Sequence, residues 1–146
     1  MSNEVIKVYG TEKTLVSSGA AVSSGAISAA SASSYGTNAD GADYPHVLFV
    51  IHAAFGSNPT ENTALGLYAQ PLDIDGTNDA PAPTTTYKQR YIGAFALKAA
   101  TDQYLSITAE DVPYLAAYYV INETTGQTLS SGWTLKATPY TYKAAA

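Results

Sequence analysis

Hydrophobic positions along this chain come in short clusters rich in Tyr, Val, Ile and Thr, and Gly, Asn, Asp and Pro separate the clusters. Alternation with a period of two is typical of β-strands, whereas a surface helix needs a period near 3.6. No segment keeps the helical period over three turns. The pattern predicts strands at Val5–Tyr9, Ala20–Ser28, His46–Phe55, Ala64–Gln70, Gln89–Lys98, Tyr104–Ile107, Tyr114–Asn122 and Trp133–Thr138.

About eight short strands in one chain of this length predict an all-β fold, a β-sandwich of the jelly-roll or a related Greek-key type. We expect little helix, because the best helical candidate is a single turn that Thr108 could cap and that Pro113 would stop. The 146 residues are enough for one domain over residues 1–146 with one core. Gly126 predicts a hairpin over Asn122–Thr128, between the last two strands.

Two of the predicted strands have clear faces. In His46–Phe55 the odd positions are apolar and most even positions are too, so we expect a central strand covered on both sides. In the strand that begins at Trp133, the residues Trp133, Leu135 and Ala137 alternate with polar ones. That alternation predicts one face in the core and one in water.

The segment 16–34 is rich in Ser and Ala, and its run Val16–Ala20 is repeated directly as Val22–Ala26. Two copies are too few for a solenoid, which needs about three repeats to bury a core. Ordering a residue costs about 1–2 kcal/mol of backbone entropy, and small side chains offset little of it. We therefore expect an N-terminal arm at 16–34 and a short C-terminal tail at 139–146 that lie against another subunit.

Composition narrows the choice of partner. Hydrophobic residues make up 46% of the chain and charged residues only 13%, which argues against intrinsic disorder and suits burial against neighbours. The net charge is −5, and the single arginine, Arg90, stands among scattered lysines without forming a basic stripe. Nucleic acids and anionic membranes are therefore not expected partners.

The sequence shows no secretory signal, no membrane-spanning segment and no cysteine. The N-terminus, Met1–Glu4, has no basic region followed by an apolar run, so we expect no secretory signal and synthesis in a host cytoplasm. The longest apolar stretch, Val47–Phe55, is too short to span a bilayer. With no cysteine, the chain has no disulfide and no thiol nucleophile.

The candidates for chemistry are few. His46 and His52 are six residues apart on one strand, roughly 20 Å, which is too far to share a metal ion. Asp73, Asp75 and Asp79 surround a glycine turn and are weak calcium candidates, because a hard cation collects several oxygens. The bidentate glutamate of a calcium loop is missing, so we favour a solvated loop. We expect no metal, no cofactor and no catalytic residue.

Tyrosine is over-represented, with twelve residues against three phenylalanines. A tyrosine ring buries a large area while its hydroxyl stays hydrogen-bonded, so tyrosines suit both contact surfaces and the rim of a sandwich core. As interface candidates the sequence offers Tyr114, Tyr118, Tyr119, Tyr140 and Tyr142.

The block from Arg90 to Tyr142 contains Tyr118-Tyr119-Val120-Ile121-Asn122 and then the segment TGQTLSSGWTLKATP at 125–139. It resembles small virion structural proteins of tailed bacteriophages, in which a "TGQ…L…GW" hairpin ends a compact β domain. The resemblance covers roughly the last third of the chain. It implies a jelly-roll capsid decoration, or cement, protein bound outside the major capsid lattice, and it carries over no functional residue because such proteins work by surface shape.

These observations together lead us to expect a non-enzymatic virion protein at the capsid surface. Its partners would be the major capsid protein and copies of itself, as a dimer or trimer. The alternative is a receptor- or glycan-binding module of a phage tail or fibre, with exposed tyrosines as contacts. Tyrosines gathered in one concave pocket would favour sugar binding, whereas tyrosines spread over flat surfaces would favour the cement protein.

Overall fold

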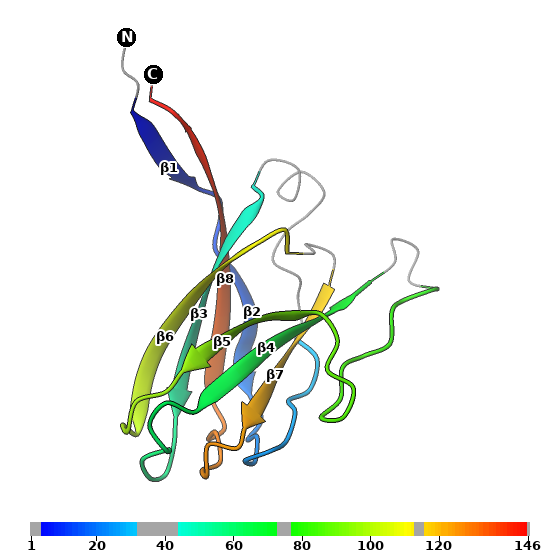
Figure 1. Cartoon of the computed structure of the whole chain (residues 1–146), viewed down its shortest axis with the longest axis vertical. Coiled ribbons are helices and arrows are strands. Elements are labelled where there is room, and N and C mark those ends of the chain that lie inside the picture. Colours follow the sequence, from blue (N-terminus) through cyan, green and yellow to red (C-terminus); the bar gives the residue numbers. More distant parts are fainter. Residues whose placement is uncertain (1–3, 32–43, 73–76, 113–115, 146) are drawn as a thin grey trace.

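The computed structural model of the chain describes residues 4–31, 44–72, 77–112 and 116–145. These residues contain no helix and form two antiparallel sheets packed face to face, which confirms the predicted all-β sandwich (Figure 1). One sheet holds β1 (Val5–Tyr9), β2 (Lys13–Gly19), β3 (His46–Ala54), β6 (Asp102–Glu110) and β8 (Trp133–Ala144). The other holds β4 (Ala64–Pro71), β5 (Tyr91–Ala96) and β7 (Ala116–Glu123).

The twelve-residue strand β8 organises the five-stranded sheet. Along one edge it pairs with β3, which in turn pairs with β6. Along its other edge it pairs first with β2, opposite 133–137, and then with β1, opposite 140–144. Strands β1 and β2 therefore share one position in the sheet. The predicted tail 139–146 is wrong for residues 139–144, because these continue β8.

The three-stranded sheet has β4 at its centre, between β5 and β7. Residues 26–31 run along the other edge of β7, where Ile27 and Ile121 form an isolated bridge. Ser28 and Ser31 donate their amides to carbonyls of β7, at 2.8 and 2.9 Å. The larger sheet has the order β1/β2, β8, β3, β6. If the segment 26–31 is counted as an edge strand, the smaller sheet has the order 26–31, β7, β4, β5. These two orders are those of a jelly roll.

The serine-rich segment is thus part of the sandwich rather than an arm, at least over residues 16–31; residues 32–34 lie outside the described residues. Its first part, 16–19, is in β2, a strand that the sequence pattern did not predict. The predicted strand Ala20–Ser28 is wrong: the structure has only isolated bridges there, at Val22 and Ile27. Small residues permit this irregular path because their side chains leave the backbone close to the neighbouring strand.

The core lies between the sheets and is built from the faces that the alternation predicted. Val47, Phe49, Ile51 and Ala53 of β3 are fully buried, as are Leu135 and Ala137 of β8. The opposite face of β3 is only half-buried along its length, so the expectation that this strand is covered on both sides is wrong. Its predicted central position, between β6 and β8, is confirmed.

Two further local predictions are wrong. The helical turn at Thr108 is instead part of β6, which continues to Glu110 because it pairs with β3 over its whole length. The hairpin over Asn122–Thr128 does not form, because β7 and β8 lie in different sheets and the intervening residues cross between them. Turn chemistry alone cannot distinguish a hairpin from a crossover of similar length.

Strands β1 and β8 continue beyond the body of the sandwich as a two-stranded extension (Figure 1). The pairing of β3 with β8 ends at His46 and Tyr140, and past that point β8 pairs only with β1. We call residues 5–8 and 141–144 the terminal ribbon. Its two strands end side by side at the tip, where Val5 pairs with Ala144.

Candidate functional site

The structure does not bring the predicted site residues together. Asp73, Asp75 and Tyr114 lie outside the described residues. Asp79 is exposed on the loop before β5. Among residues 4–31, 44–72, 77–112 and 116–145, no group of three or more His, Asp or Glu side chains could hold a metal ion.

Tyr118 and Tyr119 point to opposite faces of β7. The Tyr118 side chain is buried in the core, 1% exposed, with its ring 5.7 Å from that of Phe49. As an interface candidate Tyr118 is therefore wrong, since a partner cannot reach it. Tyr119 is half-buried on the outer face and donates its hydroxyl to Gln70 Oε1 at 3.2 Å.

Tyr140 and Tyr142 do lie together, at the base of the terminal ribbon. Their rings meet edge to face at 5.8 Å, and His46 stacks on Tyr140 at 5.0 Å. Tyr9 of β1 completes the group, 5.9 Å from Tyr140. We call Tyr9, His46, Tyr140 and Tyr142 the aromatic cluster. Lys7 lies over it, with Nζ 4.1 Å from the centre of the Tyr140 ring, a cation–π contact.

The cluster shields Tyr140, which is only 5% exposed, but leaves apolar groups in solvent along the ribbon and at its base. Val5 is 67% exposed, Tyr142 52%, Tyr9 51% and Ile6 41%. Val5 and Tyr9 share a face with Tyr142, while Ile6 is on the opposite face, so both faces carry apolar side chains. In the described residues the outer edge of β1 is unpaired, as is the edge of β8 beyond Tyr140.

A two-stranded ribbon is at best marginally stable in water by itself. Exposed apolar strands with free edges are ready to pair with another chain, and proteins normally blunt them with charges or cover them. Here one of the two ribbon lysines, Lys7, is held against the aromatic cluster rather than out at the edge. The terminal ribbon is therefore the clearest candidate contact surface among the described residues.

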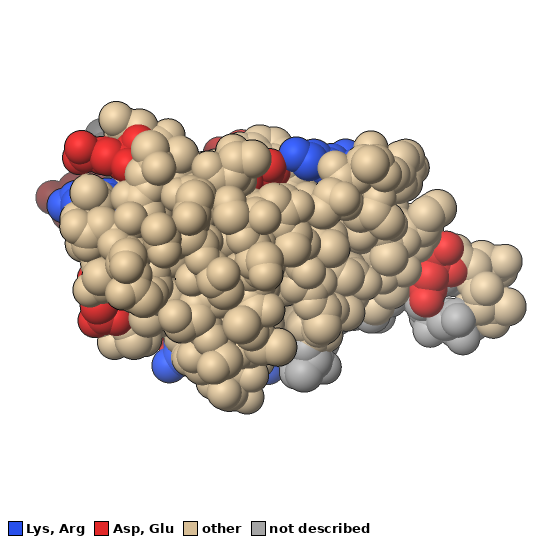
Figure 2. Space-filling model, turned by 90° about the horizontal axis from the view of Figure 1, so that it is seen from below, with Lys and Arg blue, Asp and Glu red and all other residues tan. Residues whose placement is uncertain are grey.

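The end of the molecule opposite the terminal ribbon carries charged residues at its rim and has a hollow nearby. Figure 2 looks at that end and shows charged residues in small groups around the rim, with uncharged residues over most of the surface. Near this end, a hollow of about 410 Å³ opens on the outer face of the five-stranded sheet. It is lined by Glu12, Val50, His52, Tyr104, Thr134 and Lys136, which we call the sheet hollow.

One wall of the sheet hollow is an aromatic stack. Tyr104 and His52 are cross-strand neighbours, and their rings lie parallel, 4.1 Å apart with an interplanar angle of 2°. Asp102 Oδ1 accepts a hydrogen bond from His52 Nε2 at 2.6 Å, which fixes the plane of the imidazole. On the other side, Lys136 Nζ lies 3.6 Å from Glu12 Oε1.

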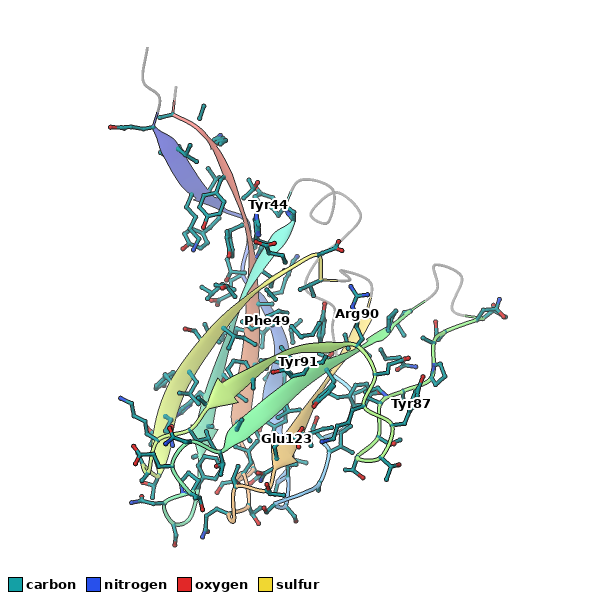
Figure 3. The ribbon with its side chains drawn as sticks, in the orientation of Figure 1. Tyr44, Phe49, Tyr87, Arg90, Tyr91 and Glu123 are labelled. Atoms are coloured by element: carbon teal, nitrogen blue, oxygen red, sulfur yellow. The ribbon has the colours of Figure 1, made fainter. Side chains whose placement is uncertain are left out.

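The outer face of the three-stranded sheet holds a third group of polar and aromatic side chains. Tyr68 donates its hydroxyl to Glu123 Oε1 at 2.9 Å, and Lys88 forms an ion pair with the same carboxylate at 2.9 Å. Burial, together with the hydrogen bond to Glu123, raises the pKa of Tyr68 to about 12. Figure 3 shows Tyr91 on β5 and Tyr87 on the loop before it, both well away from the ribbon.

The TGQ segment has a structural role. Asn122 is fully buried and donates its side-chain amide to the carbonyls of Val22 and Gln127, at 2.9 and 2.8 Å. Thr125, also fully buried, donates its hydroxyl to Asn122 Oδ1 at 2.6 Å. Gly126 adopts a positive φ of 81°, which favours glycine. These residues fix the crossover from β7 to β8.

Sequence reasoning missed the aromatic cluster as a group, as well as the sheet hollow. Tyr9 and His46 join Tyr140 only through strand pairing across more than 90 positions. The one local signal was the alternation of β1, which places Val5, Lys7 and Tyr9 on one face.

Comparison with known proteins adds no relative: no protein-family model matches the chain, and no curated protein matches it in sequence. No helix long and apolar enough to cross a membrane occurs in the part of the chain that the structure describes.

Proposed function

We propose that the protein is a non-enzymatic virion structural protein, a capsid decoration or cement protein that binds and stabilises a phage major capsid lattice. One observation carries the proposal: the terminal ribbon extends Val5, Ile6 and Tyr142 into solvent on two strands with free edges. A ribbon of this kind gains stability when a partner covers its apolar side chains and pairs with its backbone.

The mode of attachment follows from the same geometry. An extended segment of a capsid subunit would add to the edge of β1, and the exposed side chains would enter pockets on its surface. One such contact is small, but a capsid offers many identical sites. Copies of the chain that also contact one another, as a dimer or trimer, would bind such a lattice with strongly increased avidity.

The distribution of tyrosines supports assembly more than a single sugar pocket. Exposed tyrosine rings occur in three separate places: Tyr142 on the ribbon with Tyr9 at its base, Tyr104 at the sheet hollow, and Tyr91 on β5 with Tyr87 on the loop before it. A module whose main function is to bind sugars through tyrosines would gather several of them in one concavity, whereas the sheet hollow is lined by Tyr104 alone among the tyrosines. The resemblance of residues 90–142 to phage virion proteins points in the same direction.

The experiment compares two tyrosines of equal exposure. Tyr142 on the ribbon and Tyr87 on the loop before β5 are both 52% exposed, so each substitution removes a similar surface ring. Purified wild-type chain, Tyr142→Ser and Tyr87→Ser would be sedimented with heads of the encoding phage that were assembled without this chain. We expect saturable binding of the wild type and of Tyr87→Ser.

The variant Tyr142→Ser should bind the heads more weakly by about tenfold, the effect expected of one aromatic anchor in an interface. A second variant, Ile6→Ser, tests the opposite face of the ribbon in the same assay. If the wild type does not co-sediment with heads, or if both ribbon variants bind as well as the wild type, the proposal is wrong.

A further inference from the structure

We infer that the sheet hollow is a binding site for a neutral saccharide ring, separate from the terminal ribbon. The site lies on the outer face of the five-stranded sheet, between β6, β3 and β8, with Glu12 contributed by the link between β1 and β2. Its volume of about 410 Å³ is within the range of small-molecule sites, roughly 300–1,000 Å³.

The aromatic wall of the hollow is held in place before any ligand arrives. Tyr104 is 72% exposed, the highest value among the large hydrophobic side chains of the described residues. It is nevertheless held by its parallel stack on His52, which Asp102 fixes in turn. His52 covers one face of the Tyr104 ring, because His52 lies between Tyr104 on β6 and Thr134 on β8. The surface of the stack that stays free is rigid, so it offers an apolar contact area at little cost in side-chain entropy, which suits the C–H face of a sugar.

The opposite wall supplies what sugar hydroxyls need. Each hydroxyl both donates and accepts hydrogen bonds. Lys136 offers donors, Glu12 offers acceptors, and Thr134 offers a hydroxyl that does both. Val50, the cross-strand neighbour of Lys136, adds an apolar group to the lining.

Charge decides between classes of sugar. The cation Lys136 lies 3.6 Å from the carboxylate of Glu12, so the pair has no net charge to offer an anionic ligand. Asp102 adds a further negative charge behind His52. With Glu12 compensated by Lys136, the Asp102 carboxylate disfavours a uronic or sialic acid, whereas a neutral hexose ring meets no such repulsion.

The hollow stays accessible when the ribbon is occupied. Lys136 and Tyr142 are six residues apart on β8, roughly 20 Å along the strand. A chain attached through its ribbon could therefore still present the hollow to a glycan. The inference does not rest on the proposed attachment to a capsid, and its test uses the isolated chain.

The experiment titrates the purified full chain with neutral monosaccharides (glucose, galactose, mannose and N-acetylglucosamine) and with glucuronic acid, followed by nuclear magnetic resonance. We expect at least one neutral sugar to shift the signals of His52 and Thr134 saturably. The variant Tyr104→Ala should weaken that binding by about tenfold or more, the scale of one lost ring contact.

The matched control is Tyr91→Ala, which removes a 59% exposed ring from the other sheet and should leave sugar binding unchanged. Lys136→Met tests the polar wall and should also weaken sugar binding. Circular dichroism should show that Tyr104→Ala and Lys136→Met keep the wild-type fold. The inference is overturned if no neutral sugar gives a saturable shift, if Tyr104→Ala binds as the wild type does, or if glucuronic acid binds more tightly than every neutral sugar.

Discussion

Trp133 and Gly19 show how a single close contact joins two distant parts of the chain. Trp133 is 3% exposed, as its place in the alternation predicted, and its indole N–H donates to the Ala20 carbonyl at 2.8 Å. Gly19 lies directly against the indole: a Cβ there would be 2.1 Å from Trp133 Cε2. The glycine of the first Ser-Ser-Gly repeat is thus required for space.

We predict that Gly19→Ala lowers the free energy of unfolding by about 1–3 kcal/mol, the usual cost of overpacking a core. The indole cannot withdraw without losing its hydrogen bond to Ala20. Gly56→Ala is the control, because a Cβ at Gly56 meets nothing within 4 Å. Urea denaturation measures both variants, and equal stability of Gly19→Ala and Gly56→Ala would contradict this account of the contact.

The segment 26–31 shows how an irregular element can replace a strand. Its backbone bonds to β7 at some positions, and at others serine hydroxyls accept the amides of β7 instead. Ser28 Oγ accepts from Val120 N–H and Ser31 Oγ from Tyr118 N–H, both at 2.9 Å. A short side chain is needed here, because only a hydroxyl one carbon from the backbone reaches the position of the missing carbonyl.

At this element we predict that Ser28→Ala destabilises the fold by about 1–3 kcal/mol, because Val120 is fully buried and its amide loses its hydroxyl acceptor. Ser17→Ala provides the comparison, since Ser17 is exposed on β2. Thermal unfolding of the two variants should separate them clearly. Ser28→Ala melting at the temperature of Ser17→Ala would show that the hydroxyl does not hold this edge.

The stability of the whole molecule should depend on pH in the alkaline range. Folding raises the pKa of Tyr68 to about 12 from its ordinary value of 10.0 through burial and the hydrogen bond to Glu123. Hydrogen bonding to Tyr9 raises the pKa of Lys7 as well. Both groups hold their protons more tightly in the folded chain, so the unfolded chain loses protons first as the pH rises.

The contribution of Tyr68 is therefore complete below pH 10 and is lost as the pH rises through about 12. We predict that the free energy of unfolding falls over this window, and that it falls less steeply in Tyr68→Phe, which has no proton to lose at that position. Chemical denaturation at a series of pH values measures both slopes. Identical slopes for the two proteins would exclude Tyr68 as a source of the alkaline loss.

Much of the fold was open to prediction because alternation is a local property. The buried faces of β3 and of the first half of β8 follow from residues two positions apart, and Val5–Tyr9 was predicted with its observed bounds. The failures fall in the serine-rich segment 16–31 and in the Asn122–Thr128 link. Small residues have no strong periodicity, and a glycine turn is compatible with either a hairpin or a crossover.

The sequence by itself determined the class of fold, the core faces of the most apolar strands and the burial of Trp133, since each depends on hydrophobic residues at short, regular spacing. Only the tertiary structure decided which strands pair. Val5 meets Ala144, and Tyr104 meets His52, through backbone hydrogen bonds that any residues can make. The terminal ribbon and the sheet hollow are products of that pairing, because strand register, not local pattern, places their side chains together.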